Sequence, residues 1–363
     1  MKMQPKRSIV KKNIDNSLFK RKVSFVRRKR VFRKSMQGVP KRVIGELRRE
    51  QYNDFYDYEK VKAPTNFSFI DNAIEFIGFL NKIDRLYDQR KKVFVKMNHI
   101  TSMADDAILV LLSSMIRFRA NNRLFNGNKP RRKDLLKRLL DSGFFQQLYS
   151  KPSLEDDYSI NTIKSKIYTH AQKTVDAPLA HDLIGQASKV VWGEKRRCPG
   201  IQNTLKELMQ NTHNHASENK GEKLWWTVIA KDWDEKKVRF SFIDYGVGVF
   251  RSLNDKKPNE KFYKALEMLK YKFPWAQSEA EQLKLILKGE LHRTSTGQQN
   301  RGKGLPAIYK NLMDGRLDSL VIITNGVYAD VKNSDFHMLD DEFHGTFISW
   351  EMNKDIFNLV WNN

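Results

Sequence analysis

The chain has 363 residues, of which 40% are hydrophobic, and its formal net charge is +24. This length allows two folded domains with hydrophobic cores, and no apolar run approaches the roughly 20 residues that a membrane span requires. The single cysteine, Cys198, excludes an internal disulfide, and no secretory hydrophobic segment occurs near the start. We therefore expect a cytoplasmic protein.

The first segment, residues 1–50, is predicted to be a disordered basic arm. Its first 45 residues contain 16 Lys or Arg and one acid, Asp15, with aromatic residues such as Phe25 and Phe32 between the basic clusters. Such cations can neutralise phosphates, and the aromatic rings can stack on exposed bases. We expect a nucleic acid or another polyanion as a partner of residues 1–45. A solvated tail, a contact with an anionic membrane and an organelle transit peptide share this composition and stay open.

Residues 60–152 are predicted to form a small α/β domain. A helix is expected over 73–80 and a strand over 92–97. The next helix, 107–116, is apolar nearly all round, as expected for a helix packed between layers. An amphipathic helix then runs from residue 135 toward a glycine at residue 143.

A helix with a polar face is predicted next. Apolar residues recur at three- and four-residue spacing from Ile201 to Thr212, whereas Glu207, Asn211 and His215 fall on another face. Magnesium prefers oxygen ligands, and an Asn carbonyl can supply one. A carboxylate one turn earlier could orient or deprotonate a water that attacks a γ-phosphate. Taken alone, this segment is more typical of a polar helix surface without chemistry.

A strand over 238–243 leads directly into Asp244, Gly246 and Gly248. A carboxylate at a strand end can accept a hydrogen bond from the exocyclic amine of adenine, and glycines let the backbone approach a nucleotide. In isolation, an ordinary Asp-x-Gly turn explains the same residues.

A segment rich in Gly and hydroxyl residues, 294–305, precedes a predicted helix over 306–312. A helix N-terminus attracts phosphate through its free N–H groups, and Arg301 and Lys303 add positive charge there. The spacing fits neither a Walker P-loop nor a dinucleotide fingerprint. Farther on, Thr346 opens a strand predicted over 347–352, where its hydroxyl could add a contact near the base.

These segments resemble the GHKL superfamily of ATP-binding domains, which includes gyrase B subunits, heat-shock-class chaperones and histidine kinases. The match covers roughly residues 157–355 and is most similar to the anti-sigma-factor kinase type. The matching motif residues are Glu207, Asn211, His215, Asp244, Gly246, Gly248, Gly302, Gly304, Leu305 and Thr346, and Arg301 and Lys303 are candidate nucleotide contacts beside them.

The resemblance implies an α/β sandwich over 157–358, with a mixed sheet and helices on one face. It also implies Mg-ATP as cofactor, with Mg²⁺ on Asn211, Glu207 as the catalytic base and the other matching residues in contact with the nucleotide. A lid is implied over about 249–301, containing predicted helices at 262–269 and 280–287.

Residues 66–150 resemble a STAS domain, a small α/β module found as a partner of such ATPases. The resemblance rests on a strand, a helix and the Leu-x-x-Ser-Gly-Phe pattern that ends at Phe144. The position of the family's phosphoacceptor hydroxyl aligns near Ala104 or Asp105, so regulated phosphorylation there is not expected. A helical spacer domain is the alternative. The STAS-like part would supply a surface for a protein partner, and the resemblance implies a bacterial protein.

The fate of the γ-phosphate stays open, because one scaffold serves several reactions. A histidine kinase is disfavoured, since His170 and His181 lie only 41 and 30 residues before Asn211 and are expected at ordinary polar helix positions. The first hypothesis is an ATPase whose lid closure acts as a regulatory switch. The alternatives are a switch that binds ATP without hydrolysis and acts on nucleic acid or a protein, in transcription control or bacterial defence, and a serine kinase of a partner protein.

Overall fold

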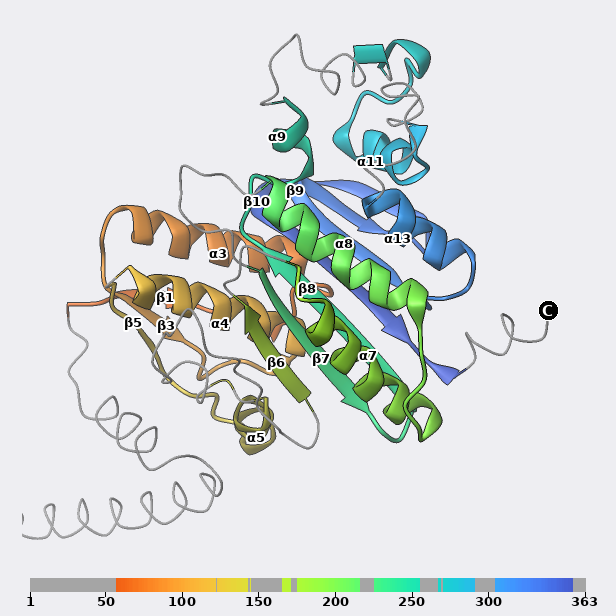
Figure 1. Cartoon of the computed structure of the whole chain (residues 1–363). Helices are drawn as coiled ribbons and strands as arrows, with labels where there is room; N and C mark the ends of the chain where they lie inside the picture. The colour runs from red at the N-terminus through yellow and green to blue at the C-terminus, as the bar shows by residue number, and fades with distance from the viewer. Residues whose placement is uncertain are drawn as a thin grey trace, which may run out of the picture. The chain divides into compact units, whose positions relative to one another are not determined.

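The protein has a mixed α/β fold with separate parallel and antiparallel sheets in this computed structural model (Figure 1). The described residues all belong to one compact unit. The predicted arm lies outside the described residues. None of the described helices is long and apolar enough to cross a membrane. The structure describes residues 57–121, 123–142, 144, 165–170, 175–215, 225–254, 267–268, 270–290 and 304–354.

The N-terminal part is built on parallel strands. β1, β3 and β5 form a three-stranded parallel sheet, and β2 pairs with β4 in a separate parallel ribbon. The predicted helix over 73–80 is confirmed and extends to residue 88, and the predicted strand over 92–97 is β3. The elements are β1 (Glu59–Lys62), β2 (Asn66–Phe67), α3 (Ala73–Asp88), β3 (Val93–Lys96), β4 (Ser102–Met103), α4 (Asp105–Ala120), β5 (Phe125–Gly127) and α5 (Lys133–Asp141).

Helix α4 is enclosed, as its apolar sequence predicted. Every residue from Asp106 to Met115 is buried, and α4 packs against β5 on one side and against β7 and β8 on another. The buried carboxylate of Asp106 accepts a hydrogen bond from the backbone N–H of Ile70 (3.2 Å). Asp105 instead pairs with Arg138 of α5 (3.0 Å). The first turn of α4 is thereby tied to two neighbouring segments.

The second sheet has the strand order β6-β7-β8-β10-β9. We expected a mixed sheet here, but all its described pairs are antiparallel, and the parallel pairs lie in the N-terminal part. β10 is much longer than the predicted strand over 347–352, and its pairing with β9 contains register shifts. The strands are β6 (Ser165–His170), β7 (Trp225–Asp232), β8 (Lys237–Asp244), β9 (Leu320–Asp330) and β10 (Asp335–Met352).

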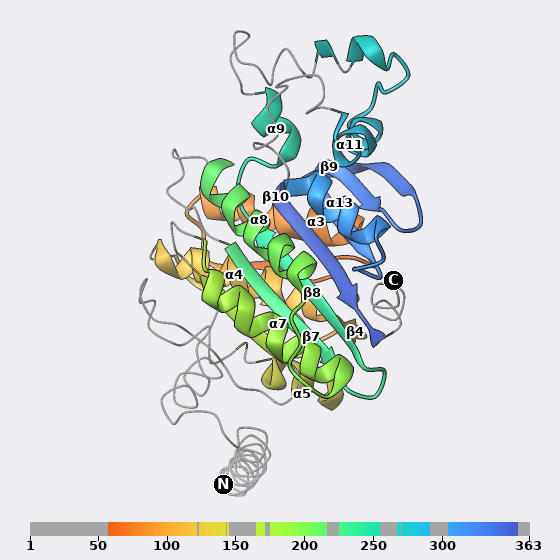
Figure 2. The same ribbon diagram turned by 45° about the vertical axis from the view of Figure 1, so that its right-hand side comes forward.

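Four helices cover one face of this sheet (Figures 1 and 2). Phe240 and Phe242 of β8 point into the core beneath them, because alternate residues of a strand share a face. α7 begins where the Asp176 side chain accepts from the N–H of Leu179 (2.8 Å) and ends at Gly193 in the left-handed region. The helices are α7 (Ala177–Trp192), α8 (Pro199–His215), α11 (Glu279–Leu287) and α13 (Gly304–Met313).

The opposite face of the sheet is covered by α3 and α4, which we did not foresee. The Phe69 ring lies 5.2 Å from that of Phe343 and 4.9 Å from that of Phe347, measured between centroids. Aromatic pairs at these separations add to the stabilisation from burial. The two predicted α/β parts are therefore joined by a continuous apolar contact.

Of the remaining predicted helices, one is confirmed, one lies largely outside the described residues, and one histidine position is wrong. The helix predicted over 280–287 is α11, and its residue Leu283 is fully buried in the core beside α13. The helix predicted over 262–269 lies largely outside the described residues. His181 is on α7 as expected, but His170 is in strand β6, so its predicted helix position is wrong.

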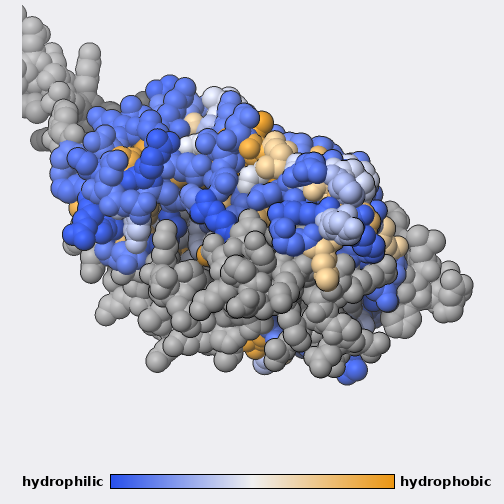
Figure 3. All heavy atoms as spheres, turned by 90° about the horizontal axis from the view of Figure 1, so that it is seen from above, coloured by the Kyte–Doolittle hydropathy of each residue, from blue (hydrophilic) through white to orange (hydrophobic). Residues whose placement is uncertain are grey.

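The surface seen from above in Figure 3 is mostly hydrophilic, with small separate apolar patches. Among the described residues, the large apolar side chains that are exposed are Ile74, Leu124, Trp233, Met268, Tyr271, Trp275, Met313 and Met338.

Candidate functional site

The candidate site begins at the end of β8, where Asp244 lies in a row of paired residues. Across the sheet, Asp244 is the register partner of Trp225 on β7 and of Thr346 on β10, and Thr346 is in turn the partner of Thr324 on β9. The antiparallel pairing thus brings residues from four separate segments of the sequence to one line.

Asp244 is half-buried, and its carboxylate is hydrogen-bonded. It accepts from the backbone N–H of Gly246 (2.8 Å) and from the side chain of Thr346. Burial raises the pKa of Asp244 from its ordinary 3.8 to about 6, although both hydrogen bonds favour the charged form. At neutral pH the group is therefore an ionised acceptor in a low-dielectric place.

Gly345 allows β10 to pass tightly against Asp244. Its φ of +145° lies in a region that suits glycine, and a Cβ there would lie 2.1 Å from the Asp244 carbonyl oxygen. The Thr324 hydroxyl donates to the Gly345 carbonyl (3.1 Å) and accepts from the N–H of Val249 (3.0 Å). These contacts fix Thr346 beside the carboxylate.

Gly248 is held by Asn325, a residue that the sequence prediction missed. Gly248 has a φ of +77°, and a Cβ there would lie 2.4 Å from Asn325 Oδ1. Asn325 Oδ1 accepts from the N–H of Phe250, and its Nδ2 donates to the Val247 carbonyl, both at 3.0 Å. The loop is thus fixed on β9 just where helix α9 (Val249–Asn254) begins. The Asn-Gly pair at 325–326, within an apolar strand, is the signal that marks this position.

Asn211 meets the first residue of α13. A Cβ on Gly304 would lie 2.4 Å from Asn211 Nδ2, so only glycine fits without displacement. The crossing is fixed about two turns farther along α13 by Asn311. Its Nδ2 donates to the Gly200 carbonyl and to Thr204 Oγ1, both at 2.9 Å. The structure therefore brings together two of the predicted motifs that lie about 90 residues apart in the sequence.

The other predicted residues have simpler positions. Glu207 is half-buried on α8, one turn before Asn211, and Leu305 packs against the core. His215 ends α8, but its side chain lies outside the described residues, as do Arg301, Gly302 and Lys303. Figure 1 shows the C-terminal end of α8, the start of α13 and α9 at the same end of the sheet.

The donor set fits Mg-ATP at the groups that are described. Asn211 offers one amide oxygen, and a magnesium ion held on a nucleotide takes its other ligands from phosphates and water. Within the described part of the chain, no group of three or more His, Cys, Asp or Glu residues could hold a metal. Asp244 offers an acceptor for a base, and the N-terminal turn of α13 offers N–H groups for phosphate.

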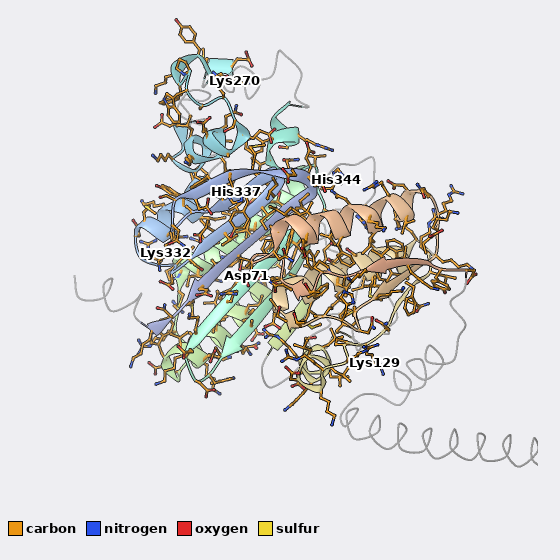
Figure 4. The ribbon with its side chains drawn as sticks, turned by 180° about the vertical axis from the view of Figure 1, so that it is seen from behind. Asp71, Lys129, Lys270, Lys332, His337 and His344 are labelled. Carbon is orange, nitrogen blue, oxygen red and sulfur yellow. The ribbon has the colours of Figure 1, made fainter. Side chains whose placement is uncertain are left out.

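A cavity of about 740 Å³ lies beside the same loop. Residues 245–247 form one wall, and α3, Arg117 of α4, Arg251 of α9 and His344 of β10 form the others. Figure 4 shows His344 at the end of the sheet, next to α3. Asp244 does not line this cavity, whereas Gly246 of the same motif does.

Comparison with known proteins adds no further assignment. No protein-family model, curated protein or solved structure matches this chain.

Proposed function

We propose that this protein binds Mg-ATP in a GHKL-type pocket at the end of β8, hydrolyses it, and uses nucleotide occupancy as a regulatory switch. The observation that carries the proposal is the meeting of distant motif residues. Asp244 contacts Thr346, and Asn211 contacts Gly304, all at one end of the sheet. Each contact joins two short motifs that lie about 90 to 100 residues apart in the sequence.

Asp244 is the residue proposed to recognise the base. An ionised carboxylate accepts hydrogen bonds only, so it suits the exocyclic amine of adenine. A base without a donor at that position would leave the remaining acceptor capacity of the carboxylate unused, and such a loss is costly away from water. Gly246 and Thr346 already occupy part of its acceptor capacity and hold its orientation.

The phosphates are proposed to lie near the start of α13. The free N–H groups and positive dipole end of that helix favour an anion, and Arg301 and Lys303 directly precede Gly304 in the sequence. Asn211 would supply the protein oxygen to a magnesium ion. When bound, the ion would neutralise negative charge on the phosphates.

Glu207 is proposed to activate water. It lies one turn before Asn211 on the same helix, so both side chains project toward the same end of the pocket. A half-buried carboxylate there can accept a proton from a water that attacks the γ-phosphate.

A switch that binds ATP without hydrolysis is the second candidate function. It is favoured by the contact between the Asp244–Gly248 loop and α4, through which nucleotide occupancy could reach a surface for a polyanion or protein partner. Hydrolysis is not needed for such a role.

The test is to measure ATP binding by calorimetry and to follow γ-labelled ATP with Mg²⁺. We expect Asp244→Ala to abolish binding and Glu207→Ala to abolish phosphate release while binding persists. Asp234→Ala is the matched control, because Asp234 is an exposed carboxylate in the turn that precedes β8. Unchanged affinity in Asp244→Ala would disprove the pocket. Binding without phosphate release by the wild type would leave the switch, and transfer of the label to a protein in cell extract would indicate a kinase.

A further inference from the structure

Tyr245 connects the candidate nucleotide loop to the N-terminal part of the protein. It follows Asp244 directly, and its hydroxyl lies 2.8 Å from Ser113 Oγ and 3.1 Å from Ser114 Oγ. The same hydroxyl donates to the Val110 carbonyl at 3.2 Å. All three partners belong to α4. A phenol hydroxyl has one donor and can accept as well, so these partners account for its hydrogen-bonding capacity.

The Tyr245 ring is half-buried and packs against side chains of α4 and the sheet. The Arg117 guanidinium of α4 lies 4.9 Å from the ring centroid, and the rings of Trp226 and Phe343 lie at 5.5 and 6.1 Å. Arg117 also pairs with Asp84 of α3. Burial raises the pKa of Tyr245, so the hydroxyl keeps its proton at neutral pH. The side chain is thus fixed between both helices and the sheet.

Two buried serines on α4 support a specific role for this contact. From Ala107 to Met115 the helix is otherwise apolar, yet Ser113 and Ser114 are 0% and 1% exposed. A buried hydroxyl is unfavourable unless it has a hydrogen-bonding partner. Ser113 also donates to the Val110 carbonyl of its own helix (2.9 Å), and Tyr245 supplies both serines with a partner from the loop after β8.

The loop that follows β8 links the Asp244 carboxylate to the Tyr245 side chain through a short stretch of backbone. The hydrogen bond from Gly246 N–H to the Asp244 carboxylate closes a turn with Tyr245 at its centre. A change in the carboxylate's partners therefore changes the backbone that carries the tyrosine. The cavity of about 740 Å³ beside residues 245–247 leaves space into which this loop can shift.

We propose that Tyr245 is a positioning residue that couples the nucleotide pocket to α4, through its hydroxyl contacts with Ser113 and Ser114. The proposal rests on the proposed function for the identity of the ligand. Nucleotide binding at Asp244 changes the loop on one side, and the Tyr245 hydroxyl carries that change to the N-terminal part. Coupling between two sites requires a contact that differs between the bound and free states. The Tyr245–α4 contact is the direct connection from this loop.

The test uses amide hydrogen exchange on the full chain with Mg²⁺ and the non-hydrolysable analogue AMP-PNP. In the wild type we expect saturation with the analogue to change exchange over residues 110–117 at least about fivefold, the lower end of typical couplings. Tyr245→Phe keeps the ring and removes the hydroxyl. We expect it to bind the analogue within about threefold of the wild-type affinity, while the response of α4 is lost.

Two further variants make the outcome specific. The double variant Ser113→Ala with Ser114→Ala removes the α4 hydroxyls that contact Tyr245 and should abolish the same response. It replaces Tyr245→Phe as the test if that variant folds poorly. Tyr328→Phe makes the same chemical change on β9, where the ring stacks on His337, and should keep the wild-type response.

The two proposals fail in different ways. If the wild type binds AMP-PNP but exchange over α4 does not respond, or if Tyr245→Phe and the serine variant both keep the response, the coupling is disproved and the pocket stands. If no variant binds the analogue, wild type included, the proposed function fails and the coupling fails with it.

Discussion

Asp244 and Thr346 face each other across the β8–β10 pair, and the Thr346 side chain hydrogen-bonds to the Asp244 carboxylate. A residue from the last described strand therefore adjusts the charge state of a residue about 100 positions earlier. The bond favours the ionised form and partly offsets the effect of burial. A ligand that hydrogen-bonds to Asp244 would therefore depend on Thr346 as well, because Thr346 affects the charge of the carboxylate.

Replacing Thr346 by Val should weaken nucleotide binding. The substitution removes the donor and keeps the shape, so the pKa of Asp244 should rise above about 6 and the carboxylate should lose part of its orientation. We expect affinity for ATP to fall about tenfold, equivalent to about 1.4 kcal/mol, the size of one good hydrogen bond. Calorimetric titration at pH 7 measures this, and Thr346→Ser, which restores the hydroxyl, should recover most of the loss. Equal affinities for Val and Ser would contradict the role.

The stability of the protein should depend on pH through Asp244. Because its folded-state pKa of about 6 exceeds the ordinary 3.8, the folded state binds more protons than the unfolded state between these values. Stability from this group therefore rises as the pH falls through that window. We expect the unfolding free energy of the wild type, relative to Asp244→Asn, to increase by about 2 kcal/mol between pH 7.5 and 4.5. Urea unfolding at both pH values measures it.

The comparison with Asp244→Asn isolates this group from Asp106, since burial raises the pKa of Asp106 to about 6 as well. If the difference in unfolding free energy between the wild type and Asp244→Asn does not change with pH, the pKa of Asp244 is not raised in the folded state. Nucleotide affinity should move in the opposite direction, because protonation below about pH 6 removes the ionised acceptor.

Gly304→Ala should disturb both stability and nucleotide binding, since the new Cβ would overlap Asn211 Nδ2. We expect a loss of about 1–3 kcal/mol in unfolding free energy, as for other overpacked contacts. Adding Asn211→Ala should relieve the overlap and recover stability. It should not recover nucleotide binding, because Asn211 is the proposed magnesium ligand. Recovery of both in the double variant would exclude Asn211 as a ligand.

Gly345→Ala should cost more than an ordinary glycine substitution. Its Cβ would lie 2.1 Å from the Asp244 carbonyl oxygen, whereas a Cβ on Gly193 would meet nothing within 4 Å. Both glycines have positive φ, so Gly193→Ala controls for backbone strain, at about 1–2 kcal/mol. We expect Gly345→Ala to lose at least about 2 kcal/mol more, since the sheet itself must shift. Similar losses in urea unfolding would mean that β10 can move away from Asp244 at little cost.

Removal of residues 1–45 should abolish polyanion binding without changing nucleotide affinity. The segment carries most of the chain's excess positive charge. The expected binding to duplex DNA weakens with salt, and each phosphate contact adds about 0.9 to the slope of log affinity against log salt concentration. Electrophoretic mobility shifts at several salt concentrations measure this. Equal DNA binding by the truncated chain would leave the arm without a role in it.

Much of the secondary structure could be predicted from the sequence. The three- and four-residue spacing around Leu205 and the alternation around Phe240 reflect which side each residue buries, so α8 and β8 were found close to their observed positions. α4 was also predicted as an enclosed helix, because its apolar residues leave no polar face. The GHKL and STAS resemblances stay proposals.

The contacts that build the site could not be predicted. The Asn-Gly pair at 325–326 marks an unusual position within an apolar strand. It does not indicate that the partner of Asn325 is Gly248, 77 residues earlier. Tyr245 occupies a variable position of the predicted motif, and its partners on α4 lie more than 130 residues away. Local periodicity reports burial, but it carries no information about which distant side chain fills the facing space.

The enclosure of α3 and α4 between two sheets decides how this protein can be dissected. Dividing the chain between residues 152 and 165 would uncover the apolar side of β8 and β10, where Phe347 now contacts Phe69. A fragment with the nucleotide motifs alone would therefore expose aromatic surface to water and tend to self-associate. Co-expression of both fragments should rescue solubility, because α3 and α4 of one fragment cover the apolar face of the sheet in the other. The candidate nucleotide motifs are best studied in the intact protein, where α3 and α4 cover the face of the sheet opposite α7 and α8.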